Sequence, residues 1–61
     1  MTLSKFAERF GEFNLVALYS EGFYLGTDWL RTFCKSCVLA NSIFEKLVWN
    51  ESKKLFEIYI K

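Results

Sequence analysis

Two cysteines in Cys34-Lys35-Ser36-Cys37 form the one short motif of the chain that points to chemistry. The C-x-x-C spacing suits a redox-active disulfide or half of a zinc site. Redox pairs work at a helix N-terminus, where the dipole lowers a thiol pKa, but these cysteines lie at least one turn inside a predicted helix. Zinc would need the same pair from a second chain, because the sequence has no histidine. Zinc shared across a dimer stays open. We expect that both thiols are reduced and packed in the apolar core, and that the protein has no cofactor or metal.

The remaining polar residues do not form a catalytic pattern. Without histidine, the chain lacks the side chain whose ordinary pKa best suits proton transfer near neutral pH. Its acidic residues lie among polar or basic neighbours, and no glycine-rich phosphate loop or nucleophile motif accompanies its hydroxyl groups. We therefore expect that the protein is not an enzyme.

Aromatic residues dominate the composition. Seven Phe, three Tyr and two Trp give twelve rings in 61 residues, and 52% of the chain is hydrophobic. A domain of this size buries only about 60% of the surface that its unfolded chain exposes, so it has few interior places for so many large side chains. We expect one compact domain, residues 1–61, that leaves an apolar and aromatic surface for a partner.

Charge and hydropathy give no indication of a charge-driven partner or of a membrane. The chain has eight Lys and Arg residues and seven Asp and Glu residues, and the two signs are interspersed along it, so no charge-driven partner is implied. Residues 1–20 lack the basic start and cleavage site of a secretory signal, and no apolar run approaches the roughly 18 residues of a membrane span. These features predict a cytoplasmic protein without a membrane partner.

The C-terminal third predicts a β-hairpin from Ile43 to Ile60. Two alternating runs rich in aromatic and β-branched residues flank the polar segment 50–53, which is typical of a hairpin turn. A turn centred on Glu51-Ser52 pairs Asn50 with Lys53, and further out Phe44 with Tyr59.

This register separates two faces of the hairpin. The more apolar face, expected in the core, carries Ile43, Leu47, Trp49, Phe56, Ile58 and Ile60. Glu45 shares that face without a partner. The other face combines apolar anchors with a Lys–Glu pair, the mixture that interfaces use. We expect it to bind the partner through Phe44, Lys46, Val48, Leu55, Glu57 and Tyr59.

A central helix is predicted from Asp28 to Ala40. Thr27 and Asp28 supply an oxygen-bearing cap and an early acid at its start. Apolar residues then recur at helical steps, and the polar pair Asn41-Ser42 ends the pattern. These apolar residues are Trp29, Leu30, Phe33, Cys34, Cys37 and Val38.

A short amphipathic helix near the N-terminus is predicted from four apolar residues at helical spacing, with Gly11 as its C-terminal stop. These four are Leu3, Phe6, Ala7 and Phe10. Residues 13–25 are ambiguous by periodicity. We favour two strands joined by a turn at Ser20-Glu21-Gly22; the alternative continues the first helix to Tyr19.

The resulting fold class is α+β, with a sheet of four antiparallel strands. The function expected from these features is a non-catalytic protein-binding module, such as a small accessory or inhibitory protein that occludes a surface of a larger protein, and one that forms homo-oligomers, first of all a homodimer. The alternative is a small nucleic-acid-binding regulator that uses the helix and the hairpin tip. Its cationic residues would be Arg31, Lys35, Lys53 and Lys54.

Overall fold

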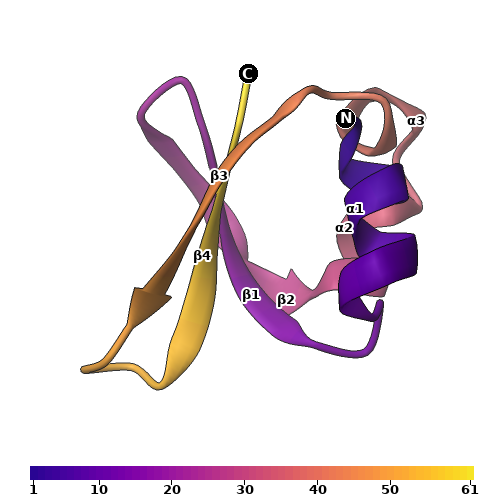
Figure 1. Cartoon of the computed structure of the whole chain (residues 1–61). Helices are drawn as coiled ribbons and strands as arrows, with labels where there is room; N and C mark the ends of the chain where they lie inside the picture. The colour runs from indigo at the N-terminus through magenta and orange to yellow at the C-terminus, as the bar shows by residue number, and fades with distance from the viewer.

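The computed structural model describes residues 1–61 and contains three helices and four strands. In chain order these are α1 (Leu3–Phe10), β1 (Leu15–Ser20), β2 (Phe23–Trp29), α2 (Leu30–Cys34), α3 (Cys37–Ala40), β3 (Phe44–Asn50) and β4 (Leu55–Ile60). The strands form one sheet in the order β2-β1-β4-β3, and the helices lie along one side of it (Figure 1). The predicted α+β class is confirmed.

The sheet is mixed, which corrects the prediction of four antiparallel strands. Each hairpin, β1 with β2 and β3 with β4, is antiparallel, but the two central strands β1 and β4 run parallel. Tight turns fix the direction within each hairpin. The α2–α3 segment then carries the chain to the far edge of the sheet, so that β4 returns beside β1 in the same direction.

Local signals determine the first half of the chain. The Thr2 side chain accepts a hydrogen bond from the backbone N–H of Lys5 and caps α1, and Gly11, with φ of 110°, ends it. Residues Glu21 and Gly22 form the β1–β2 turn with φ of 50° and 86°, the positive values that the favoured two-residue hairpin turn requires. The strand interpretation of residues 13–25 is confirmed, and the helical alternative is wrong.

The predicted continuous helix from Asp28 to Ala40 is wrong at its start. Strand β2 runs on to Trp29, and the helix begins only at Leu30. Its first free N–H groups are satisfied from far along the chain, because Leu30 N–H donates to the Asn14 carbonyl at 2.8 Å. No local pattern predicts such a long-range cap.

The same segment also breaks in the middle. Helix α2 ends at Cys34 with tight turns in which the N–H groups of Lys35 and Ser36 donate to carbonyls three residues earlier. The Ser36 side chain then accepts a hydrogen bond from Leu39 N–H and caps α3. Serine competes well for backbone groups, so it starts a new helix here instead of continuing the old one.

The C-terminal hairpin forms, but its register differs from the predicted one by two residues. Asn50 pairs with Leu55 instead of Lys53, because the loop contains four residues and Lys54 adopts a positive φ of 57°. The Asn50 side chain accepts the N–H of Lys53 and stabilises this loop. A two-residue shift keeps each side chain on its face, since side chains alternate with a period of two.

A β-bulge changes the start of β3. The register shifts between Phe44 and Lys46, so Glu45 is the extra residue and Phe44 lies opposite Ile60 on the helix-covered face. The bulge moves Glu45 out of the apolar face, where the regular alternation had placed it. It also leaves the side chain of Ile43 exposed, although Ile43 was predicted in the core. The core prediction is wrong for Trp49 as well, because its side chain lies near the end of β3 and is exposed.

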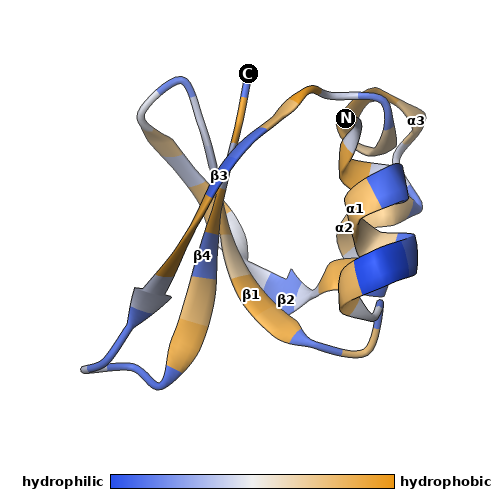
Figure 2. Cartoon of the chain, in the orientation of Figure 1, coloured by the Kyte–Doolittle hydropathy of each residue, from blue (hydrophilic) through white to orange (hydrophobic).

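The core lies between the sheet and the helices. Its buried residues come from α1, β1, α2 and β4: Leu3, Ala7, Val16, Leu18, Leu30, Ile58 and Ile60. The hydrophilic residues of α1 lie on the side of the helix that faces away from the sheet (Figure 2). A ladder of aromatic rings connects α1 to the C-terminal hairpin, in the order Phe44, Phe6, Phe10, Phe56 and Trp49, with centroids 4.2 to 5.2 Å apart. None of the aromatic side chains is fully buried, which agrees with the shortage of interior space.

Candidate functional site

The face of the sheet that is turned away from the helices is uncovered in the structure (Figure 1). We call it the outer face. According to the strand registers it comprises Leu15, Ala17, Tyr19, Tyr24, Thr27, Trp29, Lys46, Val48, Asn50, Leu55, Glu57 and Tyr59. All four strands contribute, and aromatic or aliphatic side chains prevail.

Tyrosines and a carboxylate form the centre of the outer face. The rings of Tyr19 and Tyr59, on the parallel strands β1 and β4, stack with centroids 4.9 Å apart and 15° between their planes. Both hydroxyls donate to Glu57, each at 3.4 Å. The Lys46 ammonium lies 4.7 Å from the centroid of the Tyr59 ring, a cation–π contact. Tyr24 packs beside Tyr19 at 5.4 Å.

The phenol groups of this cluster are held in their neutral form. Loss of hydration among the neighbouring side chains raises the pKa of Tyr19 and of Tyr59 above the usual value, and the charge of Glu57 raises both further. Asn50 adds a third hydrogen bond to Glu57, at 3.0 Å. The carboxylate is therefore surrounded by donors, and the tyrosines remain hydrogen-bond donors through neutral pH.

The two edges of the sheet differ in how they discourage pairing with another strand. Edge strand β3 has charged residues at Glu45 and Lys46 as well as its bulge, which are features that protect an edge. Edge strand β2 also has a register irregularity, opposite Leu18 and Tyr19, and one acidic residue, Asp28, but it contains no lysine or proline, and its Tyr24 and Trp29 are exposed. The apolar part of the outer face therefore continues to the β2 edge.

Most of the predicted partner-binding residues share the outer face. Lys46, Val48, Leu55, Glu57 and Tyr59 lie there, in line with the strand alternation. The sixth predicted residue, Phe44, does not. Because of the bulge it lies on the inner face, where its ring stacks on Phe6 at 4.2 Å.

Sequence reasoning missed the contribution of the first hairpin. Tyr19, Tyr24 and Trp29 lie on the same face because β1 pairs with β4. The alternation within residues 15–20 already placed Leu15, Ala17 and Tyr19 on one side of a strand. The missing information was which strand lies beside β1, and no local pattern supplies it.

The two cysteines are free thiols in different settings. Cys34 is half-buried against the core, and burial raises the pKa of its thiol, with a smaller contribution from Glu12. Cys37 is exposed, so the prediction that both thiols are interior is wrong for Cys37; the break between α2 and α3 separates them. Nowhere in the chain do three or more His, Cys, Asp or Glu side chains gather in a way that could hold a metal ion.

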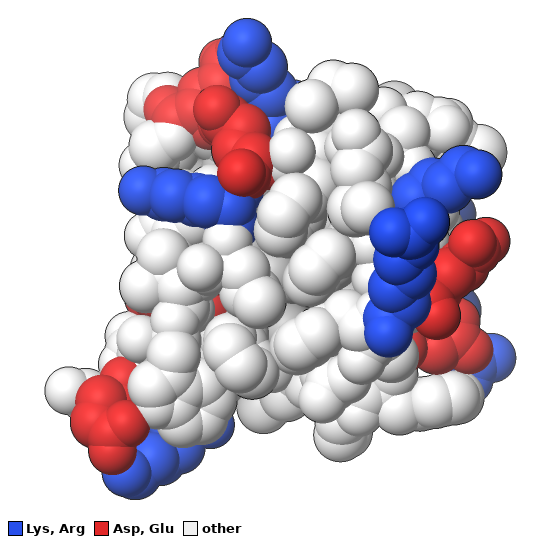
Figure 3. Space-filling view, in the orientation of Figure 1, with Lys and Arg blue, Asp and Glu red and all other residues white.

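The cations of the nucleic-acid alternative do not form one patch. Lys53 and Lys54 lie in the β3–β4 turn, which is far from α2, where Arg31 lies and which Lys35 directly follows (Figure 1). Lys54 is also paired with Glu51. In the space-filling view, charged groups of both signs lie around the margin of a broad uncharged area (Figure 3).

None of the helices combines the length and the hydrophobicity that a membrane crossing needs. Comparisons of the chain with protein-family models, with curated proteins and with solved structures find no match. The inference of function therefore rests on the geometry of the chain itself.

Proposed function

We propose that this chain is a non-catalytic protein-binding module that works through the outer face of its sheet, and that its first partner is a second copy of the chain. The observation that carries the proposal is the uncovered, aromatic-rich outer face. An antiparallel hairpin exposed to water normally carries polar residues on its solvated face. Here Leu15, Tyr24, Trp29 and Val48 are exposed on that face instead. A contiguous apolar surface of this kind marks an interaction site.

The arrangement of the central rings favours a protein over a single nucleic-acid strand. Single-strand binders present flat ring faces on which bases stack. The Tyr19 and Tyr59 rings are stacked on each other, which occupies the ring faces between them. The Glu57 carboxylate at the centre would repel phosphate groups, and Lys46 is the only cation on this face.

The charges of the outer face suit self-association. A twofold dimer brings the same patch of both copies together, so that a positive group of one copy can pair with a negative group of the other. Lys46 and Glu57 supply one charge of each sign within an otherwise uncharged face. Two sheets stacked face to face, about 10 Å apart, are a standard arrangement. A standard interface buries about 800 Å² per partner, roughly a fifth of the 4085 Å² surface of this chain. The same face would let the module cover a surface of a larger protein, as an accessory or inhibitory protein does.

Sedimentation equilibrium tests the proposal. At about 100 μM, a concentration at which even a dimer of micromolar Kd is nearly complete, we expect a mass near twice the 7.2 kDa of the chain. Val48→Glu places a charge on the outer face and should give a monomer. Val38→Glu is the matched control, because Val38 lies in α3, away from the sheet, and is 79% exposed. A monomeric wild-type chain, or equal effects of both variants, would contradict the proposal.

A further inference from the structure

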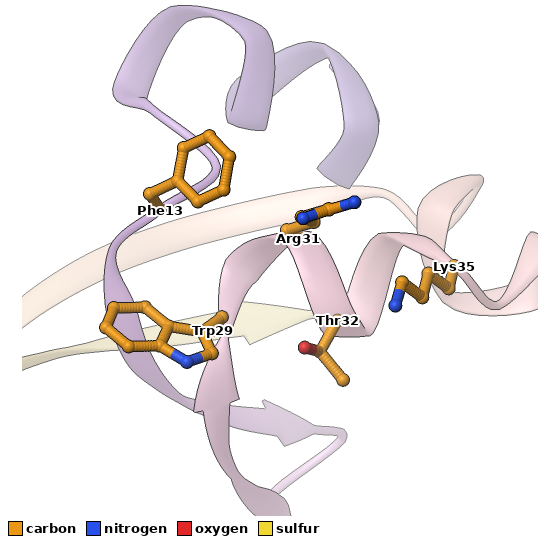
Figure 4. A pocket seen from close by; sticks show the side chains of 5 residues that line it. All are labelled: Phe13, Trp29, Arg31, Thr32 and Lys35. Carbon is orange, nitrogen blue, oxygen red and sulfur yellow. The ribbon is translucent and has the colours of Figure 1, made fainter.

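A pocket lies where the end of β2 meets α2, with a volume of about 260 Å³. It is lined by Phe13, Trp29, Arg31, Thr32 and Lys35 (Figure 4). The rings of Phe13 and Trp29 lie on one side, and Thr32 and Lys35 lie on the other, with Arg31 between them (Figure 4). The two rings are 67% and 50% exposed, so they are free to contact a ligand.

Positive charge and hydrogen-bond donors are concentrated in this pocket. A guanidinium, an ammonium and a hydroxyl group line it, and none of its lining residues is acidic. The Arg31 guanidinium lies 5.6 Å from the centroid of the Phe13 ring, which holds the cation beside the aromatic wall. The nearby Asp28 carboxylate already accepts the backbone N–H of Trp29, at 2.7 Å.

From this juxtaposition we infer that the pocket binds a nucleoside monophosphate, a ligand that joins one planar ring system to one phosphate. The base would stack on Trp29 and Phe13, and the phosphate would accept hydrogen bonds from Arg31, Thr32 and Lys35. Three separate donors match the three terminal oxygens of a phosphate better than the two of a carboxylate. The volume lies just below the roughly 300 to 1,000 Å³ of pockets for drug-sized ligands, which limits the ligand to about this size. Trp29 also lies on the outer face, so a dimer that covered its ring would compete with this ligand; the inference itself does not rest on the proposed dimer.

An NMR titration of the ¹⁵N-labelled chain with adenosine 5′-monophosphate tests this inference. We expect saturable shifts of the Trp29 indole N–H and the Thr32 amide, with a Kd on the order of 1 mM, as befits an open pocket. Adenosine and ribose 5-phosphate each lack one half of the ligand and should bind at least about tenfold more weakly, the loss expected when a charge-assisted hydrogen bond or a stacking contact is missing. No saturable shift, or equal binding of adenosine, would overturn the inference.

Two variants locate the phosphate contacts. Lys35→Ala should weaken binding of the monophosphate about tenfold and leave binding of adenosine unchanged. Lys53→Ala removes an exposed lysine from the β3–β4 turn and should change neither. Both lysines are exposed, so both variants should fold, which far-ultraviolet circular dichroism checks. Unchanged monophosphate binding in Lys35→Ala would refute the phosphate assignment.

Two further ligands separate the free nucleotide from macromolecular sources of the same chemistry. A single-stranded oligonucleotide without terminal phosphates and free phosphotyrosine should both bind the pocket more weakly than the monophosphate. Tighter binding of the oligonucleotide at these residues would overturn the inference and identify a nucleic-acid strand as the ligand. Tighter binding of phosphotyrosine would overturn the inference and identify a phosphopeptide as the ligand.

Discussion

Replacing Ile58 by alanine tests the packing of the core. Ile58 is fully buried in β4, between its register partners Leu18 on β1 and Leu47 on β3. Truncation loses the free energy that the deleted groups gain by leaving water for the core, and it leaves a cavity between the sheet and the helices. Together these effects cost about 2 to 5 kcal/mol for Ile→Ala. A domain of this length has a total stability of roughly 3 to 9 kcal/mol. Ile58→Ala should therefore remove at least about a fifth of the stability, and at the upper end of this cost it unfolds the chain.

Urea denaturation followed by tryptophan fluorescence measures this loss, at low micromolar concentration so that self-association contributes little. Ile43→Ala is the matched control, because Ile43 is the same residue type but 50% exposed. We expect it to cost less than about 1 kcal/mol. If the two variants lose equal stability, or if Ile43→Ala loses more, the bulge and the assignment of the inner face are wrong.

Two further predictions concern titratable groups. Because the folded-state pKa of Tyr19 and of Tyr59 is raised, the contribution of these tyrosines to stability is present below a pH of about 10 and is lost as the pH rises through the raised values. A spectrophotometric titration should show that Glu57→Gln lowers both pKa values relative to the wild-type chain. Unchanged pKa values would exclude the coupling to Glu57. Cys37 is exposed, whereas burial raises the pKa of the Cys34 thiol, so Cys37 should react faster with a thiol reagent at neutral pH. Peptide mapping after partial labelling measures both rates. Faster labelling of Cys34 would contradict the structure.

Local signals in the sequence predicted those elements whose ends are set by neighbouring residues. Gly11 marks the end of α1 and Glu21-Gly22 marks the first turn, as predicted from helix-stop and turn preferences. The Thr2 cap at the start of α1 is equally local, but it was not predicted. The central helix was mispredicted because its first N–H group finds its partner at Asn14, and because Ser36 competes as a new cap. Both effects depend on contacts or competitions that helical periodicity does not measure.

The candidate site was predictable only for the half that the C-terminal hairpin supplies. Strand alternation places Val48, Glu57 and Tyr59 on one face in either register, because the two registers differ by an even number of residues. The bulge that turns Phe44 inward interrupts that alternation. The contribution of the first hairpin depends on the parallel pairing of β1 with β4, which joins segments about 40 residues apart and has no local signature.

Dilution followed by NMR most directly tests the claim that the outer face is an interface. Amide and side-chain resonances of the ¹⁵N-labelled chain are compared between hundreds of micromolar and a few micromolar, a range that spans the affinity of a typical weak dimer. We expect concentration-dependent shifts on the outer face, including those of Tyr24 and Val48, while resonances of Val38 in α3 stay constant. Shifts confined to the helices, or no shifts over this range, would contradict it.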